Sequence, residues 1–220
     1  ANYILEETLF VSDDKAVLEC LDKKGAYTIA CYHKGVDGFI GSTQYAIEGI
    51  AGIDADYMIK VYRRFRGIPW DISETKRCLI REMGPDDLDD LYELYSDERV
   101  TKYTDLLFAD REAEKHYMED YIENIYKYFG FGTWLIRRKE DGVLIGMAGF
   151  NYRPGFEEAE LGFVIGCPFW RNGYAYEVCR QLLYLGKSVF EFEKIQALAD
   201  KDNTASVCLL EKLGFGYAQD

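Results

Sequence analysis

A turn with the sequence WRNGYA, at residues 170–175, precedes a long helix pattern. The first N–H groups of a helix have no partner within it, and the helix dipole adds positive potential there. Gly173 permits close approach to the backbone, Ala175 adds little bulk, and Arg171 offers a charge. The turn therefore predicts a site for a pyrophosphate-type anion. Because single-glycine turns between a strand and a helix are common, the motif alone leaves a purely structural interpretation open.

Three further polar residues lie in neighbouring elements. Glu160 belongs to the strand pattern 157–166, and alternation places it on the same face as Gly162. The missing side chain at Gly162 leaves that face open, so Glu160 is a candidate general base. A salt bridge with a neighbouring residue is the alternative role for Glu160. Asn203 and Ser206 begin a later helix pattern, in which Asn203 could also be an ordinary N-cap.

The elements around these residues predict an α/β domain with a mixed sheet. Pro85 and Asp110 begin two helices, and the Asp141-Gly142 pair predicts a hairpin. Gly214 ends the last helix. Strands are expected over 76–83, 133–139, 143–152, 157–166 and 194–200, and later helices over 171–190 and 203–213. A hairpin meander followed by a β-α-β crossover gives a mixed sheet with flanking helices.

The preceding residues predict a separate small α/β domain. A strand over 4–12 leads to a helix with Ser12 as the expected N-cap. Further strands are expected over 26–32 and 45–47, with a glycine-rich loop over 33–43 between them. Asp54 is the expected cap of a second helix. The segment 67–75 breaks the pattern, so we place the domains at 1–75 and 76–220.

Composition narrows the function classes. The 220 residues carry a net charge of −13, which disfavours a nucleic-acid partner, and 48% hydrophobic content fits a globular chain. No apolar run approaches the roughly 20 residues of a membrane helix, and we see no signal peptide. The six cysteines form no C-x-x-C pair, and the two histidines lie apart. We therefore expect reduced thiols, no metal and a cytoplasmic location.

The second domain resembles the GNAT superfamily of acetyltransferases. The turn at 170–175 resembles the family pattern Gln/Arg-x-x-Gly-x-Gly/Ala, with Trp170 in the first place. Asn203-Thr204-Ala205-Ser206, followed by Gly214-Phe215, resembles a second family motif. The segments ELGFVI and CPFW, at 160–165 and 167–170, look like the branch that acetylates ribosomal-protein N-termini. The resemblance covers about 76–220.

The resemblance implies acetyl-CoA as co-substrate and acetyl transfer to a primary amine by direct attack in a ternary complex. Two neighbouring parallel strands of this fold separate, and the first binds the pantetheine arm through its backbone. Glu160 would act as base, a backbone N–H near Val164 as oxyanion donor, and Ser206 or a tyrosine such as Tyr152 as acid for the thiolate. The implied cofactor-binding residues are Phe163, Val164, Ile165, Arg171, Asn172, Gly173, Tyr174, Ala175 and Asn203.

The acceptor and the assembly are less defined. Many family members carry a tyrosine seven residues after the motif asparagine, where this chain has Leu210. We expect a small-molecule amine or a protein N-terminus as acceptor, and no membrane partner. The chain stops at Asp220, where the family has a further strand, so we expect either more residues or a partner chain, such as a homodimer. A catalytically silent acyl-CoA-binding regulator remains an alternative. A phosphate-binding module in residues 1–75, faintly similar to half of a HAD-like or receiver domain, is the other.

Overall fold

The structure, a computed structural model, describes residues 4–34, 43–51 and 53–218. The chain divides into two compact units, Ala1–Trp70 and Asp71–Asp220. The boundary falls after Trp70 rather than after Thr75, because residues 71–74 form a strand that pairs within the second unit. Part of the segment that breaks the sequence pattern therefore supplies an edge strand of the second unit.

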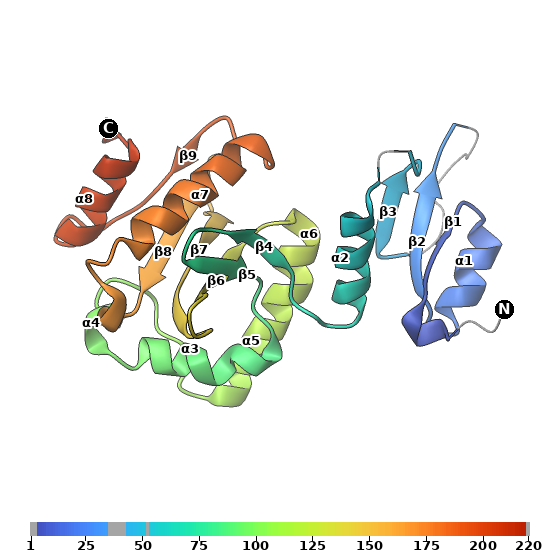
Figure 1. Cartoon of the computed structure of the whole chain (residues 1–220), viewed down its shortest axis with the longest axis horizontal. Helices are drawn as coiled ribbons and strands as arrows, with labels where there is room; N and C mark the ends of the chain where they lie inside the picture. The colour runs from blue at the N-terminus through green and yellow to red at the C-terminus, as the bar shows by residue number, and fades with distance from the viewer. Residues whose placement is uncertain (1–3, 35–42, 52, 219–220) are drawn as a thin grey trace. The chain divides into compact units, whose positions relative to one another are not determined.

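The first unit is a parallel three-stranded sheet with a helix on each face (Figure 1). Ile29 and Cys31 pack with Val61 on one face, while Ala30, which alternates with them, packs with Leu18 on the other. Most of the expected loop over 33–43 lies outside the described residues. The elements are β1 (Leu9–Ser12), α1 (Lys15–Asp22), β2 (Tyr27–Tyr32), β3 (Tyr45–Glu48) and α2 (Ala55–Phe65).

The second unit is built on a mixed six-stranded sheet in the order β4-β5-β6-β7-β8-β9. Neighbouring strands are antiparallel except β8 and β9, which are parallel. This arrangement confirms the predicted α/β class with a mixed sheet. The strands are β4 (Asp71–Glu74), β5 (Cys78–Arg81), β6 (Thr133–Arg138), β7 (Leu144–Tyr152), β8 (Ala159–Ile165) and β9 (Ile195–Gln196).

Helices cover both faces of this sheet (Figure 1). Phe150 of β7 lies against Gly186 on one face, whereas Met147, of opposite parity, accepts a hydrogen bond from Tyr95 Oη at 3.9 Å on the other. Phe150 therefore marks the α7 face and Met147 the α3 face. The helices are α3 (Leu88–Tyr95), α4 (Glu98–Thr101), α5 (Arg111–Tyr121), α6 (Lys127–Phe129), α7 (Tyr174–Ser188) and α8 (Thr204–Leu213).

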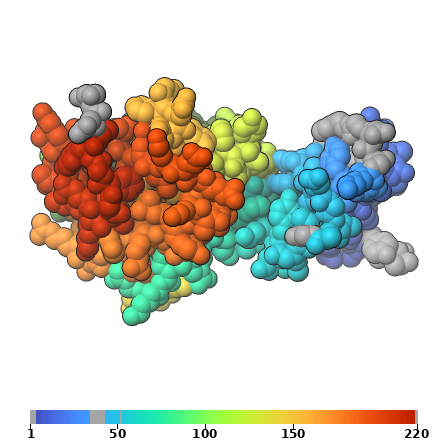
Figure 2. Space-filling view, turned by 90° about the horizontal axis from the view of Figure 1, so that it is seen from above, coloured from blue at the N-terminus to red at the C-terminus, as the bar shows by residue number. Residues whose placement is uncertain are grey.

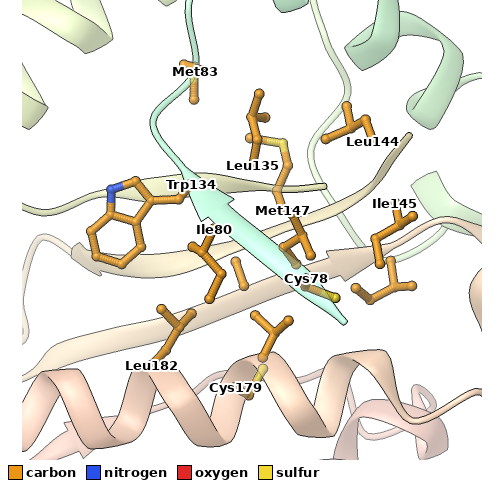
Figure 3. Packing of buried hydrophobic residues seen from close by; sticks show 14 of the residues in the cluster. Cys78, Ile80, Met83, Trp134, Leu135, Leu144, Ile145, Met147, Cys179 and Leu182 are labelled. Atoms are coloured by element: carbon orange, nitrogen blue, oxygen red, sulfur yellow. The ribbon is translucent and has the colours of Figure 1, made fainter. Parts of the chain in front are cut away.

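One part of the core of the second unit lies between α7 and the sheet. Figure 3 shows Cys78 and Ile80 of β5 above Cys179 and Leu182 of α7. All four side chains are inaccessible to solvent, and a fully buried aliphatic side chain contributes about 1.5–3 kcal/mol. This packing fixes the start of α7 relative to the strands.

The helix starts confirm several sequence predictions. Asp54 accepts a bond from the Tyr57 N–H at 2.8 Å, and Asp110 accepts one from the Glu112 N–H at 3.1 Å. The last helix, α8, packs beside α7, and their red and orange surfaces adjoin in Figure 2. Within the described residues, no helix combines the length and the apolar character needed to cross a membrane.

Candidate active site

The turn before α7 has the backbone geometry of an anion site. Gly173 adopts a left-handed conformation with φ of 79°, and Arg171 does so with φ of 59°. The first backbone bond of the helix runs from the Glu177 N–H to the Gly173 carbonyl at 3.0 Å. The N–H groups of residues 174–176, which lie between Gly173 and Glu177, come before this first bond and have no carbonyl partner within the helix. Successive N–H groups in turns with left-handed residues can form an anion-binding concavity, and an anion site at this turn stays a prediction.

Side chains within the turn hold this conformation. Trp170 Nε1 donates to the Ile165 carbonyl at 2.5 Å, which ties the turn to the end of β8. Asn172 Nδ2 donates to the Trp170 carbonyl at 3.1 Å. Tyr174 is buried beneath the helix start, while Ala175 is half-buried. Trp170 thus orders the turn, and its family counterpart is Gln or Arg.

Strands β8 and β9 separate after a short pairing. In the part of the chain that the structure describes, their ladder joins only Ala159 to Ile195 and Glu160 to Gln196. On its other edge, β8 stays paired with β7 through Ile165. Residues 161–165 therefore have one edge facing the gap, as predicted, although β9 spans two residues rather than the expected 194–200.

The alternation of backbone groups identifies which residues face the gap. The Gly166 N–H donates to the Ile145 carbonyl of β7 at 2.9 Å. Val164, two residues earlier, has the same parity, so its N–H also points toward β7. The N–H groups of Phe163 and Ile165 point the opposite way, into the gap. The expected oxyanion donor near Val164 therefore has two candidates that face the gap, the N–H groups of Phe163 and Ile165, whereas the N–H of Val164 itself does not face it.

Glu160 lies on the face of β8 that looks toward α3. Its partner in β7 is Asn151, and Gly162 and Val164 pair with Gly149 and Met147. Directly opposed residues share a face, so Glu160, Gly162 and Val164 lie on the Met147 side. A side chain at Gly162 would meet nothing within 4 Å. The structure thus leaves open space at Gly162, on the face that carries Glu160, as the pattern predicts.

A salt bridge holds the Glu160 carboxylate. Arg153 Nε donates to Oε2 at 2.6 Å and Nη2 to Oε1 at 2.9 Å. The side chain of Arg153 is 52% exposed, whereas that of Glu160 is 14% exposed. No sequence pattern indicates this partner, because Arg153 follows the end of β7 in an irregular segment. The alternative role foreseen for Glu160 is therefore present in this structure.

Asn203 and Ser206 meet at the start of α8. The Ser206 N–H donates to Asn203 Oδ1 at 3.2 Å, so Asn203 is the N-cap. Tyr103 Oη donates to the adjacent Asp202 carbonyl at 3.2 Å, a contact that the sequence did not indicate. Leu210, at the place of the family tyrosine, is buried.

Tyr152 lies on the other side of the sheet from Glu160. It has the parity of Phe150 in β7, and its ring packs against Phe131 at 5.5 Å. Phe131 in turn contacts Phe192, which follows α7. This parity argues against Tyr152 as the acid for the thiolate.

The acidic pair of the first unit is engaged in local contacts. Asp14, not Ser12, caps α1 and accepts from the Ala16 and Val17 N–H groups at 2.7 and 3.2 Å. Asp13 Oδ2 lies 2.7 Å from His33 Nε2. The hydrogen bond with His33 lowers the pKa of Asp13 and raises the pKa of His33. Both carboxylates therefore have structural partners, so the geometry adds no support for a receiver-like site.

Comparisons with known proteins agree with this geometry. The family model of the acetyltransferase (GNAT) domain matches residues 77–216. The uncharacterized N-acetyltransferase YoaA of Bacillus subtilis is 31% identical over 145 residues, covering 66% of this chain and 82% of YoaA. A crystal structure of a GNAT-family acetyltransferase from Bacillus anthracis aligns with a TM-score of 0.54 and 25% identity, over 64% of this chain and 81% of that one.

The chain therefore belongs to the GNAT acetyltransferase family. It is an N-acyltransferase that transfers an acyl group from acetyl-CoA to an amine. The expected fold and reaction are confirmed, and the silent-regulator and receiver-like alternatives are not favoured.

Proposed function

We propose that this enzyme acetylates a primary amine by direct attack, with Glu160 as general base and the turn at 170–175 as the pyrophosphate site. The observation that carries the proposal is the position of Glu160 at the last β8–β9 pair, where the two strands separate. The open space at Gly162 lies on the same face. A carboxylate, an open surface and a free strand edge thus lie within a few residues.

The proposed reaction requires two proton transfers, one from the attacking amine and one to the departing thiolate. Glu160, directly or through a water, takes a proton from the amine as its nitrogen attacks the thioester carbonyl. The N–H of Phe163 or Ile165 stabilises the oxyanion. The carbon–sulfur bond then breaks, and the thiolate is protonated. We propose Ser206 as the donor, because Leu210 cannot donate and Tyr152 lies on the opposite face. Asn203 orders the helix start beside it, and no metal is needed.

A cationic acceptor suits the surroundings. Burial raises the pKa values of Tyr95 and Tyr117, and the negative charges of Glu114 and Asp105 raise both pKa values further. The negative charge of Asp105 also raises the pKa of Arg153. Aromatic rings beside carboxylates attract ammonium groups. We therefore propose a small-molecule amine or a protein N-terminus as acceptor, in the cytoplasm.

Membership of the ribosomal-protein N-terminal branch is a finer proposal. It rests on the 160–170 sequence, and a putative ribosomal-protein-serine acetyltransferase from Vibrio cholerae shares the fold at a TM-score of 0.55 and 20% identity. A homodimer and the absence of nucleic-acid partners also remain proposals.

Thiol release from acetyl-CoA tests the proposed chemistry. The acceptor panel contains polyamines, amino acids and peptides with free N-termini. Saturable release with one amine class supports the proposal and assigns the acceptor. A folded enzyme that binds acetyl-CoA but releases thiol with no amine contradicts it.

A further inference from the structure

Arg77, just before β5, reaches the turn from a distant part of the sequence. Its Nη1 donates to the Asn172 carbonyl at 3.0 Å. Its Nε and backbone N–H donate to Glu177 at 2.7 and 2.9 Å. The guanidinium carbon lies 4.1 Å from the centre of the Tyr174 ring. One arginine thus contacts the turn and the first turn of α7 together.

The contact with Asn172 sets the direction of a peptide group. In a trans peptide, the C=O and the following N–H point in opposite directions. Because the Asn172 carbonyl points to Arg77, the Gly173 N–H points away from it. Left-handed conformations such as that of Arg171 are costly for non-glycine residues and persist only where the surroundings hold them. The hydrogen bond from Arg77 to the Asn172 carbonyl is one of the contacts that stabilise this turn.

The contact with Glu177 balances charge at the helix start. Burial alone would raise the pKa of Glu177, but hydrogen bonds from Thr75 and Arg77 outweigh it and hold the pKa below its usual value. Glu177 is therefore ionised at neutral pH and would repel an anion at the same helix end. The paired guanidinium cancels this charge, so the N–H groups and the helix dipole keep a positive potential.

We propose that Arg77 is a positioning residue for the pyrophosphate of acetyl-CoA. Arg77 orients the Gly173 N–H and neutralises the charge of Glu177. The inference rests on the proposed role of the turn at 170–175. Arg77 acts through other residues and not on the reacting atoms. Replacing Arg77 should therefore weaken only the part of the acetyl-CoA binding affinity that comes from the pyrophosphate.

Calorimetric titration with acetyl-CoA tests this role. Arg77→Gln should raise Kd roughly tenfold or more, the effect of losing a hydrogen bond with a charged group. The Kd of Arg77→Lys should fall between those of wild type and Arg77→Gln, because a lysine keeps the charge but lacks the planar guanidinium that contacts both partners. Adding Glu177→Gln to Arg77→Gln should restore part of the affinity by removing the uncompensated charge. Arg180→Gln, at an exposed arginine of α7, is the matched control.

A ligand without the pyrophosphate separates positioning from general damage. S-acetylpantetheine, followed by ligand-observed NMR, should bind wild type and Arg77→Gln equally, and thermal melting checks folding. Equal loss of both ligands, or an unchanged Kd for acetyl-CoA, would overturn the proposal. A wild-type protein that does not bind acetyl-CoA contradicts the proposed pyrophosphate site itself, which is a distinct result.

Discussion

Glu160 and Arg153 form a two-point ion pair at the place where β8 and β9 begin to separate. The guanidinium is the more exposed partner, so it lies on the solvent side of the carboxylate. Because Arg153 is half-exposed, water screens this ion pair, which contributes on the order of 1 kcal/mol. We propose that a cationic acceptor displaces Arg153 and takes its place beside Glu160.

The base role predicts a specific kinetic defect. Glu160→Gln keeps the size of the side chain but cannot accept the amine proton, so kcat should fall roughly 10²- to 10⁴-fold. Affinity for acetyl-CoA, measured by calorimetry, should stay within about twofold, because Glu160 does not contact the pyrophosphate turn. Glu157→Gln, at an exposed carboxylate before β8, should retain activity. A kcat equal to that of wild type would rule out Glu160 as base.

Two opposed glycines should respond differently to substitution. A Cβ at Gly149 would lie 1.9 Å from the Gly132 carbonyl oxygen, whereas one at Gly162 meets nothing within 4 Å. Gly149→Ala should therefore lower the free energy of unfolding by roughly 1–3 kcal/mol or more, as overpacking does. Gly162→Val should fold like wild type but lose activity, because its side chain fills the space beside Glu160. Denaturant unfolding and thiol release measure the two effects. Equal stability losses would contradict this assignment of one open and one closed position on the same face of the sheet.

The buried carboxyl of Asp87 predicts an acid-dependent stability. Burial raises its pKa, but hydrogen bonds from Arg81 and Arg137 outweigh burial and hold the pKa below its usual value. The stabilisation is therefore complete above about pH 4, the unfolded value, and is lost as pH falls through the lower folded value. Asp87→Asn should cost roughly 3 kcal/mol at pH 7 and flatten the acid limb of stability.

Urea unfolding between pH 2 and 7 measures that dependence. Asp86→Asn, at the exposed neighbouring carboxylate, is the control and should leave the acid limb unchanged. A variant at Asp87 with the same pH profile as wild type would show that this ion pair does not determine the acid dependence.

Local patterns predicted much of the second unit. The strand patterns at 143–152 and 157–166, the hairpin at Asp141-Gly142 and the long apolar stripe of α7 each depend on residues close in sequence. The same holds for the caps at Asp110 and Asn203, whose side chains bond to N–H groups two or three residues away. Such short-range features can be predicted from the sequence alone.

Contacts between distant segments could not be predicted. Strand β4 exists because Asp71 and Ser73 pair with β5, whereas the sequence of 67–75, with Gly67 and Pro69, predicts only a break in the pattern. The Arg77–Glu177 bond joins residues that lie 100 positions apart in the sequence, so no local spacing predicts it. The direction of the Val164 N–H depends on its register with Met147, which alternation within one strand does not specify.

The pyrophosphate site is the central claim, and calorimetric binding of acetyl-CoA to wild type, Gly173→Asn and Gly173→Asp tests it most directly. Asn and Asp both tolerate the left-handed backbone at this position and differ mainly in charge. We predict micromolar binding by wild type, weaker binding by the Asn variant, and a further loss of roughly tenfold or more with Asp, because its carboxylate repels the pyrophosphate. Equal affinities of folded Asn and Asp variants, or no binding by wild type, would contradict the account.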